Sequence, residues 1–370
     1  MKLTVNLIRI LTGILFIFSG LVKAIDPLGL SYKMQEFFEA WASSGFMPAL
    51  MHGLTGYSLS FSVVMITLEV VVGMALILGW RPKITTRILL LLILFFTFLT
   101  AYVLFSGKIR SCGCFGDCIP ITPIQTFTKD IILLIFSIIL VWKHASISQL
   151  LKEGKNGFAL GLGLIATLLL QFYVLHHLPL VDCLPFKKGN NILELRKMPP
   201  NAIMDEYAYE FVYEKEGRKV SYTPATLPDS SWNFVERKQT LIKKGSNNIP
   251  LINDFNLSNA DEEDVTEAIL NINETYFLLF MKDLPGSLET LTQDLKTLME
   301  ANKDKKFYII TSDRAAINTY IAQNNLDFAD VFTCDGTAIK TAARVNPTLF
   351  KMQGPVIQGK WAGADIDEIK

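Results

Sequence analysis

The sequence predicts an α-helical membrane bundle that is joined to a C-terminal α/β domain. Half of the 370 residues are hydrophobic, and the long apolar runs are confined to residues 1–180. From about residue 249, short apolar strands alternate with stretches of helical periodicity, a pattern typical of α/β folds. The formal net charge of zero gives no reason to expect nucleic acid or another polyanion as a partner.

Each of five apolar runs is long enough to cross a bilayer, whose hydrocarbon core takes about 20 residues of helix. A continuous helix is needed there because it satisfies its own backbone hydrogen bonds. The first run is read as a retained helix, since Ser19–Lys23 is a poor cleavage site for a signal peptidase. The predicted spans are Leu3–Val22, Ser58–Leu78, Ile84–Phe105, Pro123–Trp142 and Phe158–Leu178.

Basic residues in short loops predict the orientation. The turn Arg81–Arg87 carries Arg81, Lys83 and Arg87, which places this turn and the N-terminus inside. Five crossings then put the C-terminal domain outside, which is the periplasm for a bacterial inner membrane. Oxidising conditions on that face favour disulfides. The cysteines expected there are Cys112, Cys114, Cys118 and Cys183.

A composition shift predicts three regions: a transmembrane domain at 1–180, a linker with a small β-rich segment at 181–248, and an α/β domain at 249–370. Between the first two spans, Tyr32–Trp41 is predicted as a helix on the membrane surface. In the middle region, Tyr207–Tyr213 and Lys219–Tyr222 are predicted as a hairpin.

The last region reads as strand, helix, strand, helix and a closing hairpin: Tyr276–Met281, Ser287–Met299, Lys306–Thr311, Arg314–Gln323, Pro347–Met352 and Val356–Trp361. With Asn346-Pro347-Thr348 before the penultimate strand, it resembles a thioredoxin-like domain, in which that proline is cis and faces the active site. The family's Cys-x-x-Cys pair is replaced here by Lys282–Ser287, which contains no cysteine. The resemblance therefore implies a redox-inert domain that docks a partner.

Residues 3–145 resemble the DoxX and MauE families of bacterial membrane proteins, which are built on four helices. The resemblance implies a DoxX-like four-helix core, a fifth helix that delivers the C-terminal domain outside, and a redox neighbourhood. DoxX-like proteins are associated with thiosulfate or quinone-linked electron transfer, and MauE-like proteins with making a disulfide-rich periplasmic enzyme. The architecture also resembles vitamin K epoxide reductase proteins. The matching residues are Gly13, Phe16, Ser19, Gly20, Lys23, Asp26, Pro27, Glu69, Gly73, Gly79, Cys112–Gly116, Lys129 and Asp130.

Three cysteines fall within seven residues after the third span: Cys112, Cys114 and Cys118. One interpretation is an exchangeable disulfide between two of them, with Arg110 favouring a thiolate. A second is a static disulfide from Cys112 or Cys118 to Cys183. A third is a zinc or cuprous site completed by His176 or His177.

Polar residues inside the predicted spans are the second candidate site, because a charge in hydrocarbon is costly unless it pairs or faces a cavity. Glu69 lies near the middle of the second span, and Lys129 and Asp130 lie about two turns into the fourth. They predict either a quinone or proton site, or an ion pair that holds the helices together. For Lys129, the favoured interpretation is structural, with its amine snorkelling to the headgroups.

Two functions follow from these observations. The first is thiol-disulfide or quinone-linked electron transfer in an inner membrane, with the outer cysteines as redox unit, a possible membrane quinone as cofactor and a periplasmic thiol protein as partner. The second is a non-enzymatic, membrane-anchored factor for the assembly or maturation of a periplasmic client.

Overall fold

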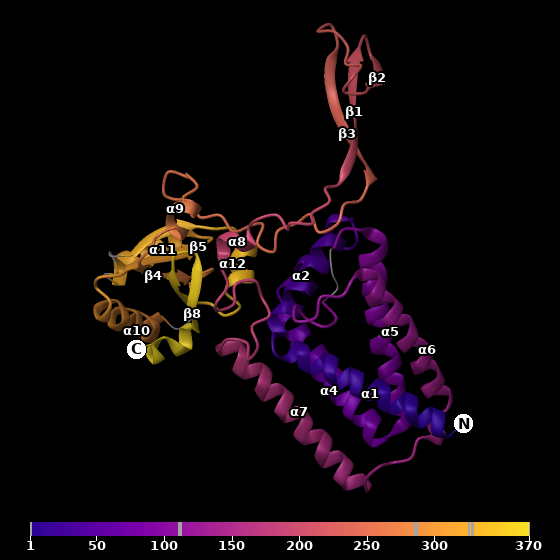
Figure 1. The fold of residues 1–370 in the computed structure, drawn as a ribbon. Coiled ribbons are helices and arrows are strands. Elements are labelled where there is room, and N and C mark those ends of the chain that lie inside the picture. Colours follow the sequence, from indigo (N-terminus) through magenta and orange to yellow (C-terminus); the bar gives the residue numbers. More distant parts are fainter. Residues whose placement is uncertain (1, 110–112, 285–287, 325, 327–328, 370) are drawn as a thin grey trace.

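The computed structural model describes residues 2–109, 113–284, 288–324, 326 and 329–369. Figure 1 shows a bundle of long helices, an α/β domain beside one end of it, and a separate sheet that projects away from both. The predicted combination of a helical membrane bundle and a C-terminal α/β domain is confirmed.

Among the described residues, five helices are long and apolar enough to cross a membrane, as predicted. Side chains such as Leu91 and Leu162 are more than half exposed on them, which suits contact with lipid acyl chains. The short 3₁₀ segment His144–Ser146 follows the fourth span. The spanning helices are α1 (Lys2–Ala24), α4 (Ser58–Leu78), α5 (Pro82–Ser106), α6 (Pro123–Trp142) and α7 (Glu153–His176).

Helices α1 and α4 cross closely because glycines meet at the crossing. A Cβ atom added to Gly73 would lie 2.8 Å from the Gly13 carbonyl oxygen, and one added to Gly20 would lie 2.6 Å from a Val70 side-chain carbon. Small residues allow such close approach of helices in a membrane. This crossing brings the C-terminal third of α1 against Glu69 of α4.

Two shorter helices, α2 (Pro27–Ser43) and α3 (Pro48–Thr55), follow α1, and Figure 1 shows α2 at the end of the bundle nearest the α/β domain. Asp26 caps α2 by accepting a hydrogen bond from the Gly29 backbone amide at 3.1 Å. Met34 and Phe37 of α2 are buried against α5, in a cluster that contains Leu99. The helix predicted over Tyr32–Trp41 is thus longer than expected, and one face of it packs on the bundle.

The α/β domain has a five-stranded sheet of order β6-β5-β4-β7-β8, in which β4, β5 and β6 are parallel and β7 and β8 run antiparallel. The Asn346–Pro347 peptide bond before β7 is cis, as the resemblance implies. The strands are β4 (Thr275–Phe280), β5 (Lys306–Thr311), β6 (Ala329–Thr333), β7 (Thr348–Gln353) and β8 (Val356–Ala362).

Helices cover both faces of this sheet. Leucines of α10 (Leu288–Ala301) and Ile317 of α11 (Arg314–Asn324) pack on one face, and α9 (Thr266–Leu270) and α12 (Gly336–Ala342) contribute to the core on the other. The second core also takes in Phe186 and Ile192, the latter from α8 (Ile192–Leu195). The chain therefore enters this domain well before the predicted start of its α/β pattern.

Strand β6 and helices α9 and α12 were not predicted, whereas the other strands of this domain lie within one residue of their expected bounds. The missed elements are five to seven residues long, too short for a clear periodicity. A final 3₁₀ segment, Gly363–Glu368, closes the domain.

The predicted hairpin is part of a three-stranded antiparallel sheet of order β2-β1-β3, formed by β1 (Glu206–Lys215), β2 (Arg218–Tyr222) and β3 (Asn233–Lys243). Every residue of β3 is exposed. We call this projecting unit the aromatic sheet, because its rings contact one another in two groups, Tyr207 with Tyr209 and a second group of Phe211, Tyr213, Tyr222, Trp232 and Phe234.

Candidate functional site

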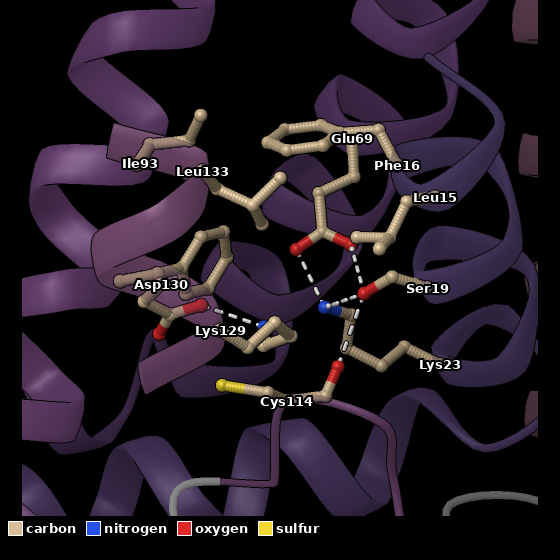
Figure 2. Close-up of a pocket in the computed structure, with 11 residues that line it drawn as sticks. Leu15, Phe16, Ser19, Lys23, Glu69, Ile93, Cys114, Lys129, Asp130 and Leu133 are labelled. Carbon is tan, nitrogen blue, oxygen red and sulfur yellow. Dashed lines mark hydrogen bonds and ion pairs between the residues drawn. The ribbon is translucent and has the colours of Figure 1, made fainter. Parts of the chain in front are cut away.

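A buried ion pair lies between α1 and α4 (Figure 2). The Lys23 Nζ atom is 2.5 Å from Glu69 Oε1, and both side chains are at most 4% exposed. Lys23 also donates to the Ser19 hydroxyl at 3.0 Å. That hydroxyl lies 3.3 Å from Glu69 Oε2 and 3.1 Å from the Cys114 carbonyl oxygen, so its single proton can serve one acceptor at a time.

A second pair lies across the same space on α6, where Lys129 Nζ is 2.6 Å from Asp130 Oδ1. The Thr100 hydroxyl of α5 donates to the other Asp130 oxygen at 3.0 Å. The Lys129 amine also lies 5.1 Å from the centre of the Phe115 ring. The side chain of Lys129 is 22% exposed and that of Asp130 is 3% exposed, but the Lys129 amine points at the buried carboxylate (Figure 2).

These four charged residues, which we call the charge cluster, line one cavity together with Ser19 and Cys114. Its volume is about 20 Å³. A water molecule needs at least about 10–15 Å³, so the cavity suits a water and is far too small for a quinone ring. A quinone head group would reach these residues only if the surrounding helices moved apart.

Cys114 belongs to the cysteine turn (residues 112–118), of which 113–118 are described. Gly113 and Gly116 have φ values of +68° and +58°, the left-handed region that glycine adopts without strain. Cys114 is 6% exposed. It also lines a hollow of about 160 Å³ formed by the turn itself, so it separates the inner cavity from the outer surface.

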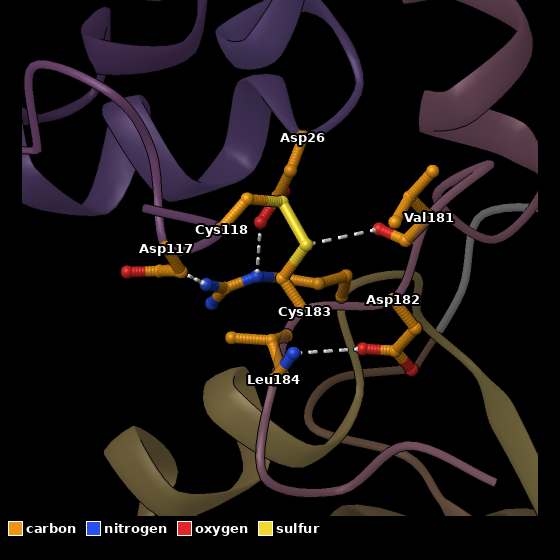
Figure 3. The surroundings of a disulfide bond; sticks show 8 residues. Asp26, Asp117, Cys118, Val181, Asp182, Cys183 and Leu184 are labelled. Atoms are coloured by element: carbon orange, nitrogen blue, oxygen red, sulfur yellow. Dashed lines mark hydrogen bonds and ion pairs between the residues drawn. A yellow bond between two sulfur atoms is a disulfide. The ribbon is translucent and has the colours of Figure 1, made fainter. Parts of the chain in front are cut away.

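The structure joins Cys118 to Cys183 in a disulfide, shown in Figure 3. This pairing is one of the two static connections considered from the sequence, and it ties the turn after α5 to the segment after α7. Cys118 is therefore not paired within its own turn. Cys112 and Arg110 lie outside the described residues.

The zinc or cuprous site considered from the sequence is not formed by the described residues. Within the described ranges, no group of three or more His, Cys, Asp or Glu side chains is placed to hold a metal ion. The Cys118 sulfur is bonded to Cys183, and the His176 ring nitrogen Nδ1 lies 2.9 Å from the Phe172 carbonyl oxygen.

In the α/β domain, Asn346 hydrogen-bonds to the start of the segment that replaces the family's Cys-x-x-Cys pair. The side chain of Asn346 accepts from the Lys282 amide at 3.0 Å and donates to the Asp283 carbonyl at 2.7 Å. The cysteine of this domain, Cys334, is buried in the core, and burial raises the pKa of its thiol to about 12. Such a thiol is protonated at neutral pH and a poor nucleophile.

The sequence indicates Glu69, Lys129 and Asp130 as candidates but no role for Lys23, which lies just beyond the predicted span Leu3–Val22 and is named only as a family match. The residue is instead in the last turn of α1 and 2% exposed. The spacing could have indicated this role, because Ser19 and Lys23 are four residues apart and therefore lie on the same face of a helix.

Comparison with known proteins supports the membrane half of this description. Residues 1–143 match the family model described as Methylamine utilisation protein MauE, and residues 207–244, the aromatic sheet, match a Domain of unknown function (DUF8463). No solved structure matches the chain.

A curated relative, Protein TlpB of Flavobacterium psychrophilum, is 26% identical over 223 residues, which cover 55% of this chain and 51% of that protein. The chain thus spans about half the length of this relative. The expected MauE resemblance is confirmed, because residues 1–143 match the MauE family model.

Proposed function

We propose that the protein carries out thiol-disulfide exchange at the outer face of a bacterial inner membrane, with Cys114 and its neighbour Cys112 as the exchanging pair. The observation that carries this proposal is the position of Cys114. Cys114 lines both the hollow formed by the cysteine turn and the cavity that is lined by the charge cluster. The MauE match of residues 1–143 also supports a membrane role of this general kind.

The proposed reaction balances as a two-electron exchange. A thiolate of a periplasmic dithiol client attacks the Cys112–Cys114 disulfide, a mixed disulfide forms, and the client's second thiol releases the reduced pair. The client becomes a disulfide and loses two electrons and two protons. A membrane quinone then takes two electrons and two protons to become a quinol, and the pair is oxidised again.

The charge cluster is suited to the proton side of this reaction. Glu69 and Lys23 are joined through Ser19 to the backbone of Cys114 at hydrogen-bonding distance. This contact reaches the backbone of Cys114 and not its sulfur, so a proton passing between the pair and the thiol would travel through a water in the shared cavity. The second disulfide, Cys118–Cys183, holds the turn in place while Cys112 and Cys114 react.

The orientation is part of this proposal and rests on the basic turn Arg81–Arg87. A reporter that is active only in the periplasm should be active when fused after Lys370. Silence of that fusion, together with activity of a fusion after Arg81, would invert the orientation.

The test of the function itself is the redox state of the turn in growing cells. Cys114→Ser should abolish activity and leave Cys112 as a thiol that alkylating reagent labels throughout growth, because the variant has no disulfide for a client thiolate to attack. Cys334→Ser is the matched control, because that thiol is buried in the other domain. Cysteines that stay in one redox state throughout growth would contradict the proposal.

The aromatic sheet favours a second function, a membrane-anchored assembly factor that holds a maturing client. Its rings lie on a sheet that no other layer of the described chain covers in Figure 1, and exposed Phe234 is 57% accessible. Replacing residues 207–244 with a short glycine-serine linker should then abolish function while Cys114→Ser leaves it intact. The exchange proposal predicts loss of function from Cys114→Ser as well.

A further inference from the structure

The α/β domain contacts the cysteine turn through one buried arginine. Arg344 precedes the cis proline by three residues and its side chain is 7% exposed. Its Nε atom lies 2.8 Å from Asp26 Oδ2, and its Nη2 atom lies 2.6 Å from Asp117 Oδ2. Figure 3 shows the two carboxylates, Asp26 and Asp117, beside the Cys118–Cys183 disulfide.

Every nitrogen of this guanidinium has an acceptor. The remaining atom, Nη1, donates to the Lys340 carbonyl oxygen at 2.9 Å, so the side chain is held from its own domain as well. Its plane also lies 5.4 Å from the centre of the Tyr32 ring of α2. Such a planar fork cannot be replaced by lysine, whose single ammonium has no comparable geometry.

The two carboxylates belong to structures that matter for the site. Asp26 caps α2 with its other oxygen, and Asp117 lies between Cys114 and Cys118 in the cysteine turn. Burial alone would lower the pKa of Arg344, but the charges of Asp26 and Asp117 outweigh it and raise the pKa. The arginine is therefore charged at every accessible pH.

The cysteine turn is otherwise held from the membrane side at its inner half, where Ser19 donates to the Cys114 carbonyl and Phe115 lies 6.2 Å from the Phe18 ring. The outer half is held by Arg344 through Asp117 and by Cys183 through Cys118. Both outer attachments come from beyond α7.

We propose that Arg344 is a positioning residue for the exchanging thiols. Through Asp117 it fixes the outer half of the cysteine turn, and so sets how far Cys114 is exposed and at what potential its couple is reduced. The α/β domain thereby contributes one side of the site in the same chain. The proposal rests on the proposed exchange function, but whether Arg344 controls the exposure of Cys114 can be measured independently of that function.

The test uses the full-length protein in detergent, equilibrated in thiol-disulfide buffers and alkylated, with each cysteine read separately by mass spectrometry. Arg344→Gln should speed alkylation of reduced Cys114 by about fivefold, because it removes a buried guanidinium whose partner Asp117 is 40% exposed and therefore partly screened by solvent. It should also shift the midpoint reduction potential of the Cys112–Cys114 couple. Arg344→Lys should restore only part of either value.

Arg314→Gln is the matched control, because Arg314 donates to the Ser258 carbonyl inside the α/β domain and does not reach the membrane part. Asp117→Asn should reproduce the effect of Arg344→Gln, and the two together should add little to either alone. If Arg344→Gln does not accumulate, Asp117→Asn carries the same test.

If both variants alkylate Cys114 within twofold of the wild-type rate and show the wild-type midpoint potential, the positioning role is overturned, even if thiol exchange is real. If instead Cys112 and Cys114 form no reversible couple, the exchange function fails, and the alkylation rate of Cys114 still decides whether Arg344 positions the turn.

Discussion

At the scale of single residues, the pair Lys23 and Glu69 has the largest expected effect on stability. Removing one partner of a buried ion pair leaves an uncompensated charge and costs about 3–5 kcal/mol. Glu69→Gln should therefore lower the midpoint of unfolding in a denaturing detergent titration, and the double variant Lys23→Met/Glu69→Met should recover much of the loss.

Glu36→Gln is the control, because Glu36 pairs with Lys33 at the surface, where an ion pair contributes about 0–1 kcal/mol. If Glu69→Gln keeps wild-type stability but loses exchange activity, Glu69 acts in proton transfer rather than in holding α1 to α4. Wild-type behaviour in both respects would leave the carboxylate without either role.

The buried thiol of Cys334 gives a pH-dependent prediction. Burial raises its pKa to about 12, so at pH 8 only about 10⁻⁴ of the folded protein carries the thiolate. Its alkylation should be very slow at pH 8 and rise about tenfold per pH unit toward pH 12. Because the unfolded thiol ionises more readily, stability falls as pH rises above about 9. Rapid labelling at pH 8 would show that the core opens locally.

At the scale of elements, the crossing of α1 and α4 depends on glycine. Gly73→Ala would place a Cβ atom 2.8 Å from the Gly13 carbonyl oxygen, a backbone atom that cannot turn aside. We expect a loss of about 1–3 kcal/mol in thermal or detergent unfolding. Gly161→Ala on α7 is the control, since nothing lies within 4 Å of its added Cβ. Equal stability of the two variants would show that the helices separate without cost.

The elements also show what a sequence pattern can and cannot predict. The spans follow from hydropathy alone, since about 20 apolar residues suffice, and Glu69 is conspicuous because it interrupts such a run. Lys23 pairs with it only because two glycines let α1 and α4 meet. The contacts of Asp117 with Arg344, and of Cys118 with Cys183, join residues far apart in the chain, and no local periodicity encodes them.

At the scale of the whole molecule, the Cys118–Cys183 disulfide fixes the α/β domain against the bundle. Helices α6 and α7 lie between its cysteines and stay inserted in the membrane, so the usual loop-entropy argument does not transfer. Lys360 with Asp182 and His177 with Asp365 add polar contacts at the same junction. The disulfide therefore acts chiefly on docking.

The double variant Cys118→Ser/Cys183→Ser should be cleaved faster by protease between α7 and α8. We expect roughly a tenfold faster rate, which corresponds to about 1.4 kcal/mol of lost docking free energy. Cys334→Ser, which leaves the junction untouched, should be cleaved at the wild-type rate. An unchanged rate in the double variant would mean that the ion pairs hold the domain without the disulfide.

The length of the aromatic sheet has a further consequence for any client. Strand β3 has 11 residues, and at about 3.3 Å per residue it extends over roughly 35 Å. That reach is close to the thickness of the hydrocarbon layer itself. Because the sheet points away from both the bundle and the α/β domain in Figure 1, a protein held at its tip is kept at a distance from the lipid. If the chain both holds and oxidises a client, as the two proposed functions together would require, that client must be elongated or flexible enough to extend from the tip of the sheet to the cysteine turn.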